Sequence, residues 1–128
     1  MEGLVQALAV ALGAACGALV RWLLGLWLNP QWSGFPLGTL LVNCAGGLLI
    51  GIAMVGFARW PNELVRLLLV TGFLGGMTTF SAFSAESLAL MQRNQWSMAL
   101  GHTLLHVLGA LLCAGAGFAL ARVLWRGA

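Results

Sequence analysis

A hydrophobic segment over residues 63–92 is too long to cross a membrane as one straight helix. At about 1.5 Å per residue it would be about 45 Å long, whereas the hydrocarbon core of a bilayer is about 30 Å thick. Its midpoint reads Gly75-Gly76-Met77-Thr78-Thr79, where glycine weakens the helix and threonine hydroxyls can bond freed backbone groups. We therefore predict a broken helix near residues 75–79. Broken helices are tolerated inside a membrane only when buried in protein or lining a polar cavity, so the break is a candidate ion or substrate site.

The composition is that of an integral membrane protein. Of the 128 residues, 61% are hydrophobic and only 7% are charged, and the mean hydropathy is +0.97. We predict a single membrane domain over residues 1–128, surrounded by lipid. No run of basic residues occurs, so we expect no nucleic-acid partner. Cys16, Cys44 and Cys113 lie in apolar segments without paired spacing, which argues against a disulfide framework or a cysteine metal site.

Four apolar segments predict four transmembrane helices, over about residues 4–28, 37–58, 63–92 and 96–125. The connections between them are short, so neighbouring helices should run antiparallel. An even number of spans places both chain ends on the same side of the membrane. The first segment lacks a basic start and is too long for a signal peptide, so we expect it to be retained as a span.

The arginines specify the orientation only weakly. The side that carries the chain ends holds Arg59, Arg66, Arg122 and Arg126. The other side holds Arg93 and, near the end of its span, Arg21. This small excess favours chain ends inside the cell, but it is compatible with insertion in both orientations.

Glycine is frequent in the predicted spans, with pairs four residues apart in the first two. Such pairs allow helix backbones to approach closely. Four helices make a bundle too thin to enclose much of a pathway, so we expect a homodimer. The competing interpretation is that membrane helices are simply rich in glycine.

Polar side chains inside the spans are candidate site residues, because lipid does not solvate them. Arg21 lies in the first span and either snorkels to the interface or attracts an anion into a vestibule. Asn43 lies one helical turn from Thr39 in the second span, where its carboxamide must face protein or water. Its two N–H donors suit an anion, and a hydrogen bond to another helix is the alternative.

Phe80 and Phe83 lie three residues apart and so share one face of the helix after the break. The edge of an aromatic ring carries partial positive charge, so such a pair could line an anion path. Packing against protein or lipid is the commoner role of aromatic residues in membranes. Ser81 and Ser84 repeat this interval on an adjoining face, where a serine hydroxyl commonly bonds the carbonyl four residues earlier.

Glu86 is the only acidic residue well inside a span, and we expect it to pair with an arginine or to face a water-filled vestibule. His102 and His106 have the spacing of a metal-binding pair, but no carboxylate or thiol is suitably grouped with them in the sequence. We therefore expect His106 to be an inward-facing polar residue, and we leave the role of His102 open. No catalytic motif is present, so we predict that the chain is not an enzyme.

Three segments resemble the signature of Fluc-type (CrcB) fluoride channels, and the resemblance covers nearly the whole chain. They are Gly17-Ala18-Leu19-Val20-Arg21-Trp22, Phe35-Pro36-Leu37-Gly38-Thr39-Leu40-Leu41-Val42-Asn43, and Gly75-Gly76-Met77-Thr78-Thr79-Phe80-Ser81-Ala82-Phe83-Ser84 followed by Glu86. The resemblance implies an all-α membrane protein with four transmembrane helices per subunit, the third broken at mid-membrane. It also implies an antiparallel, dual-topology homodimer with two fluoride pores and a central structural sodium ion.

The resemblance further implies roles for single residues. Backbone carbonyls of Gly75 and Thr78 from each subunit would hold the sodium ion, a hard cation that prefers oxygen. Phe80 and Phe83 would line the pores, and Asn43 would donate to fluoride. The whole set expected along the fluoride pathway is Arg21, Thr39, Asn43, Phe80, Ser81, Phe83, Ser84, Glu86 and His106. The activity implied is passive, selective fluoride export across the bacterial plasma (inner) membrane, which relieves fluoride toxicity.

Two positions depart from the usual pattern of that family. Ala82 stands where threonine is common and Ala110 where serine is frequent, which removes hydroxyls from the expected polar track. A second candidate function is a small multidrug-resistance-type dimeric transporter, coupled to protons by a carboxylate in its first span. Here Glu2 stands at the terminus and Glu86 in the third span. A non-transporting membrane subunit is a third candidate, but it would not explain Asn43 or the break.

Overall fold

The computed structural model describes residues 1–31 and 35–126, and within these ranges the chain is helical and contains no β-strand. Four helical segments are long and apolar enough to cross a membrane. They are α1 (Glu2–Leu28), α2 (Leu37–Arg59), the segment Glu63–Gln92 and α6 (Trp96–Leu124). All four predicted helices are therefore present. α1 begins at Glu2 rather than at residue 4, and α6 ends at Leu124 rather than at residue 125.

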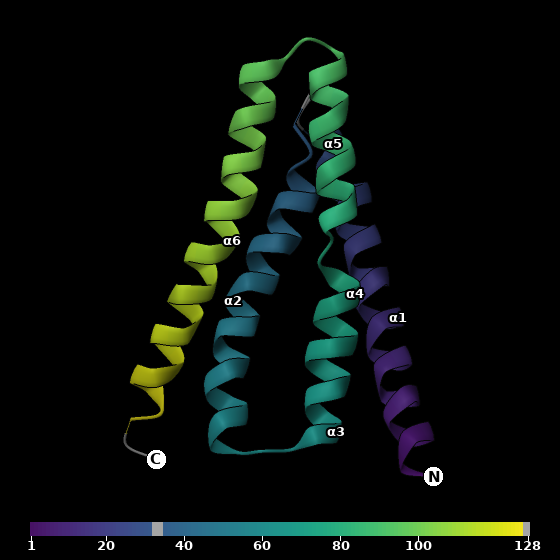
Figure 1. Cartoon of the computed structure of the whole chain (residues 1–128), viewed down its shortest axis with the longest axis vertical. Helices are drawn as coiled ribbons and strands as arrows, with labels where there is room; N and C mark the ends of the chain where they lie inside the picture. The colour runs from purple at the N-terminus through teal and green to yellow at the C-terminus, as the bar shows by residue number, and fades with distance from the viewer. Residues whose placement is uncertain (32–34, 127–128) are drawn as a thin grey trace.

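Short connections make neighbouring spans antiparallel, and the start of α1 and the end of α6 lie at the same end of the molecule (Figure 1). A 3-10 turn, η1 (Asn29–Gln31), follows α1. Asn62 Oδ1 accepts from the Val65 N–H at 3.0 Å and caps the start of the third span. The turn before α6 uses Asn94 with φ of 58°, a left-handed conformation that asparagine tolerates better than most residues.

The third span contains several kinds of helix. α3 (Glu63–Arg66) is followed by the π-helix η2 (Leu67–Leu74) and by the short α4 (Gly75–Met77). Thr78 and Thr79 then have extended backbone, with φ/ψ of −81°/155° and −153°/121°. Regular helix resumes as α5 (Phe80–Gln92). The π-helix was not predicted from the sequence.

Glycines make the closest contacts between the spans. A Cβ atom on Gly17 would overlap the carbonyl of Phe73, so this glycine lets α1 lie directly against η2. A Cβ atom on Gly51 would overlap the carbonyl of Ala114, so α2 lies equally close to α6 (Figure 1). These small residues therefore serve packing within one chain, and they do not by themselves argue for a dimer.

Little of the chain is buried in a conventional core. The main apolar cluster consists of Val42, Leu74 and Met77, where α2 meets the third span. Most leucines of α1 and α6 are exposed, as expected for helices that face lipid. The two fully buried side chains of largest volume are Val42 and His102. A histidine at such a position points to a polar interior near the α5–α6 turn.

Candidate functional site

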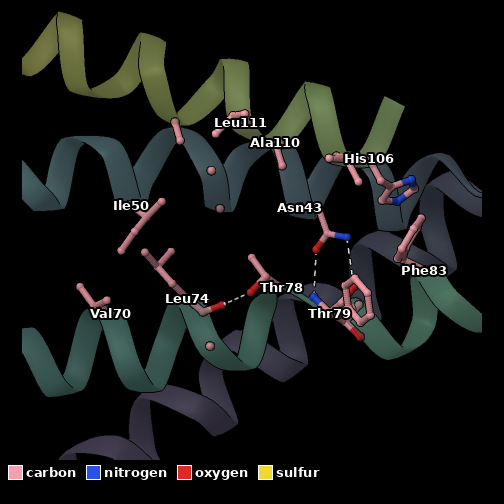
Figure 2. Close-up of a pocket in the computed structure, with 16 residues that line it drawn as sticks. Asn43, Ile50, Val70, Leu74, Thr78, Thr79, Phe83, His106, Ala110 and Leu111 are labelled. Atoms are coloured by element: carbon pink, nitrogen blue, oxygen red, sulfur yellow. Dashed lines mark hydrogen bonds between the residues drawn. The ribbon is translucent and has the colours of Figure 1, made fainter. Parts of the chain in front are cut away.

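The carboxamide of Asn43 bridges α2 to the interruption of the third span. Its Oδ1 accepts from the Thr79 N–H at 2.9 Å, and its Nδ2 donates to the Thr79 carbonyl at 3.1 Å (Figure 2). Both bonds go to the backbone of one residue, so the amide stabilises the extended conformation there. The interhelical hydrogen bond, one of two interpretations of Asn43 from the sequence, is thus present.

The two threonine hydroxyls of the interruption are also hydrogen-bonded. Thr78 Oγ1 donates to the Leu74 carbonyl at 2.8 Å, and Thr79 Oγ1 accepts from the Ala82 N–H at 3.1 Å as the cap of α5. Arg21 Nε donates to the Gly76 carbonyl at 3.2 Å. Arg21 is therefore held against the interrupted span rather than extended freely toward the end of its own helix.

A cleft of about 670 Å³ lies between α2, α6 and the third span. Figure 2 shows apolar side chains at one end of this cleft and the polar and aromatic ones at the other. Figure 2 places Asn43, Thr79, Phe83 and His106 at the polar end. Phe80 lines the cleft next to Phe83. The cleft thus leads from an apolar region to the Asn43 amide and then to two aromatic rings and an imidazole.

The two phenylalanines predicted to line a path lie next to each other, with ring centroids 5.3 Å apart. Phe80 is 77% exposed and Phe83 is 8% exposed. Phe83 also stacks on His102, at 5.5 Å between centroids, and lies 4.9 Å from the ring of His106. The buried ring of Phe83 is therefore fixed in position, whereas Phe80 is free to contact lipid or a second chain.

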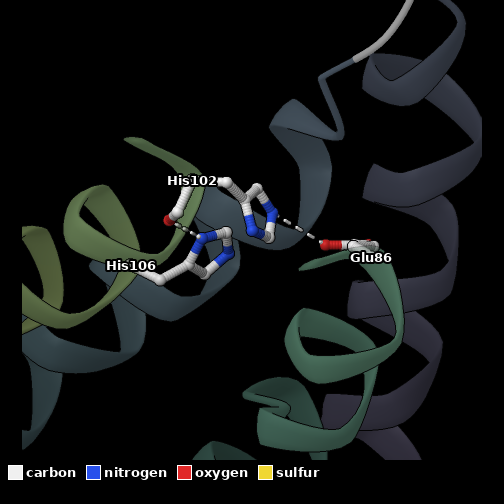
Figure 3. A group of neighbouring side chains, drawn as sticks. All are labelled: Glu86, His102 and His106. Atoms are coloured by element: carbon white, nitrogen blue, oxygen red, sulfur yellow. Dashed lines mark hydrogen bonds and ion pairs between the residues drawn. The ribbon is translucent and has the colours of Figure 1, made fainter. Parts of the chain in front are cut away.

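Glu86 is positioned by neighbours other than an arginine. Thr39 Oγ1 donates to Glu86 Oε1 at 2.5 Å, and His102 Nε2 lies 3.3 Å from Glu86 Oε2 (Figure 3). Its side chain is 22% exposed and lines a second hollow of about 240 Å³ beside the α5–α6 turn, together with Phe35 and Arg93. Polar side chains thus connect the two hollows, with His106 at the large cleft and Glu86 at the small one.

The expectation that no carboxylate is grouped with His102 and His106 is wrong. One ligating atom from each of the two histidines and from Glu86 lies within 4.8 Å of the others. α5 and α6 form an antiparallel helical hairpin around Asn94, and residues 86 and 102 are equally distant from it in the sequence. Reading the hairpin register would have revealed the cluster.

Comparison with known proteins shows the family to which the chain belongs. The family model described as "CrcB-like protein, Camphor Resistance (CrcB)" matches residues 8–118. The chain belongs to the CrcB family. A "Fluoride-specific ion channel FluC" of Bordetella petrii is 52% identical over 120 residues, which cover 91% of each chain. Proteins of the same name from Aromatoleum aromaticum and Pseudomonas aeruginosa are 51% identical over 122 residues (94% and 92% covered) and 53% identical over 107 residues (82% and 84% covered).

Membership of the CrcB family settles two points. With four apolar helices, the chain is a multi-pass membrane protein. Its relatives carry the name of an ion channel, so this CrcB protein is a transport protein rather than an enzyme.

The serines of α5 in this CrcB protein have different partners. Ser84 Oγ donates to the Phe80 carbonyl at 2.9 Å, the local bond expected of a helical serine, and Ser81 Oγ lies 3.2 Å from Thr79 Oγ1. Ser87, which was not among the predicted site residues, lies 2.9 Å from His102 Nδ1. Its place one turn beyond Ser84 was the only sequence signal for it.

Proposed function

We propose that this CrcB protein is a fluoride-selective channel that exports F⁻ passively from the bacterial cytoplasm across the inner membrane. The observation that carries the proposal is the polar end of the large cleft, where the Asn43 amide and the rings of Phe80 and Phe83 line the same space. The relatives named as fluoride-specific channels support the same ion.

The chemistry of these groups suits a small anion. Fluoride is tightly hydrated, so a selective path must replace its water with donors that bind without trapping it. The Asn43 amide has two N–H donors, of which one bonds the Thr79 carbonyl, leaving one for an anion. The positive edges of Phe80 and Phe83 would continue the path, and the Ser81 hydroxyl would add a donor beside them.

We also propose the antiparallel, dual-topology homodimer with two pores, in which the third spans meet at mid-membrane. A single chain leaves the cleft open to lipid beside the exposed ring of Phe80, and a second chain would cover it. The helix interruption at Thr78 and Thr79 would then lie at the dimer centre and be buried in protein, one of the two settings in which a membrane tolerates a broken helix.

A structural sodium ion at that centre would suit the groups present. The Thr79 N–H donates to Asn43 rather than to the carbonyl of Gly75, its usual acceptor in an α-helix. The Gly75 and Thr78 carbonyls of both chains would hold the ion, and hard cations prefer such oxygen ligands. The ion would supply fixed positive charge that offsets the carbonyl dipoles of two chains.

The proton-coupled drug transporter receives less support. That mechanism needs a carboxylate within the first span, and the acid of α1 is Glu2, in its first turn. Glu86 instead accepts a hydrogen bond from Thr39 beside the histidines. No relative quoted above carries the name of a drug transporter.

The test is fluoride release from liposomes that contain the purified protein and potassium fluoride. With no proton gradient, a passive channel should release fluoride once valinomycin lets potassium follow. A proton-coupled drug transporter exchanges protons for a cationic drug and should release no fluoride, and that result would contradict the proposal.

A further inference from the structure

Three buried polar atoms of the described residues lack a hydrogen-bond partner, and all three belong to one cluster. They are Glu86 Oε2, His102 Nε2 and His106 Nε2. His102 is 0% exposed and His106 is 4% exposed. Glu86 Oε2 and His102 Nε2 face each other at 3.3 Å, and His106 Nε2 points toward the same place without a partner. Buried polar atoms that converge in this way point to a shared ligand.

We propose that Glu86, His102 and His106 form a binding site for a divalent transition-metal ion such as Zn²⁺. Two imidazoles and one carboxylate are a common set of three protein ligands for such ions, with further positions left for water. The three ligating atoms lie within 4.8 Å of one another. Atoms around one zinc ion are about 3–4 Å apart, so small side-chain rotations would complete the site.

Each of these three side chains has a second polar atom that does not face the cluster. Hydrogen bonds to that second atom orient the side chain, as is usual for metal ligands. His106 Nδ1 lies 3.1 Å from the carbonyl of His102. A carbonyl can only accept, so Nδ1 carries the proton and Nε2 presents its lone pair. His102 Nδ1 bonds Ser87 Oγ at 2.9 Å, and Glu86 Oε1 accepts from Thr39. Each ligand is thus oriented by a second bond, leaving its other atom directed into the cluster.

An ion can reach this site without unfolding the protein. Glu86 lines the small hollow beside the α5–α6 turn, and His106 lines the large cleft. The site therefore lies between two hollows, with Arg93 at the outer one as the nearby positive charge. The Glu86 carboxylate supplies the negative charge that favours binding of a divalent cation.

Direct metal binding tests this inference. The full-length protein, purified without a histidine tag and treated with chelator, is titrated with Zn²⁺ and its bound metal is counted. We expect one high-affinity ion per chain and a higher melting temperature with zinc. X-ray absorption should show nitrogen and oxygen neighbours, and sulfur neighbours would overturn the site by assigning the metal to cysteines.

Variants then identify the ligands. His102→Gln should weaken Zn²⁺ binding more than roughly 10-fold, because even loss of an outer partner of a metal ligand costs about 10–100-fold. Glu86→Gln and His106→Gln remove the other two ligands one at a time, so the test survives if one variant fails to fold. Glu63→Gln is the matched control, because Glu63 bonds Arg66 in the first turn of the third span. Unchanged affinity in the three ligand variants would overturn the site.

A flux measurement extends the test and rests on the proposed function. Glu86 and His106 belong to the proposed fluoride pathway, so bound Zn²⁺ should slow fluoride release from liposomes. If zinc binds as predicted and flux does not change, the metal site stands and the pathway assignment is contradicted. If zinc does not bind, the metal site fails whatever the flux.

Discussion

Asn43 has an observed structural role, and we propose a role in transport for the same side chain. It closes two hydrogen bonds with the backbone of Thr79, and it does so at the polar end of the cleft. The sequence predicted that this carboxamide faces protein or water. It left open whether the partner is an anion or another helix, because an amide satisfies both chemistries equally well.

We predict that Asn43→Ala destabilises the protein by about 1–3 kcal/mol, since it leaves the Thr79 N–H and carbonyl without their partner. Thermal unfolding in detergent measures the change. Gln6→Ala is the control, because Gln6 is an exposed amide on α1 and should change stability by less than about 0.5 kcal/mol. Equal stability of the Asn43 and Gln6 variants would contradict the bridging role.

A second prediction about single residues concerns Phe80 and Phe83. Replacing Phe80 or Phe83 by isoleucine keeps a branched apolar side chain and removes the positive ring edge. If each ring edge lowers the free-energy barrier to ion passage by about 0.5–1.5 kcal/mol, each substitution should slow fluoride flux roughly 2–10-fold. Phe118→Ile on α6 is the matched control, because Phe118 packs against Arg122 away from the polar end of the cleft. If both variants conduct fluoride at the wild-type rate, the two rings do not line the path.

The contacts among Glu86, His102 and His106 were not predicted from the sequence. Glu86 was correctly noted as an unusual acid, yet its partners proved to be Thr39 and His102. Composition and local spacing do not reveal such contacts, because they depend on which faces of two helices meet. The contact became predictable only from the hairpin that joins α5 to α6.

Among the elements, the third span differs most from a regular helix. The glycine and threonine residues at its midpoint predicted weak helix, and Thr78 and Thr79 have extended backbone. The π-helix η2 before them carries no comparable signal, since its sequence Leu-Leu-Leu-Val-Thr-Gly-Phe-Leu suits an ordinary apolar helix. Among its neighbours, η2 packs most extensively against α1, where Gly17 approaches the carbonyl of Phe73.

Those contacts supply a prediction about elements. Gly17→Ala would place a Cβ atom on the carbonyl of Phe73 and force α1 away from η2, so it should destabilise the protein by about 1–3 kcal/mol. Gly115→Ala in α6 meets no atom within 4 Å and should be neutral or stabilising by up to about 1 kcal/mol. Thermal unfolding of the two variants checks this difference. Equal effects would show that α1 does not depend on a close approach at Gly17.

For the whole molecule, length and hydropathy predicted the four helices, and the start of α1 and the end of α6 lie at the same end of the molecule, as an even number of spans requires (Figure 1). The homodimer and its two orientations remain predictions. A sequence encodes its contacts with a second copy only in surface residues, and in a membrane protein these resemble residues that face lipid. The exposed ring of Phe80 illustrates the ambiguity.

Sodium gives a prediction at this scale. If Gly75 and Thr78 carbonyls of two chains hold Na⁺, then replacing sodium by N-methylglucamine at equal ionic strength should lower the melting temperature of the purified protein. Sodium at 100 times its dissociation constant would raise the free energy of unfolding by about 2.7 kcal/mol. A melting temperature that does not depend on the cation would contradict a structural sodium ion.

The central claim is that this CrcB protein passes fluoride selectively and passively. The most direct measurement compares fluoride and chloride efflux from the same liposomes, loaded with both potassium salts and opened by valinomycin. We expect rapid fluoride release with hardly any chloride release, because the Asn43 amide and the aromatic edges fit a small anion. No fluoride release, or equal release of the two ions, would contradict the account.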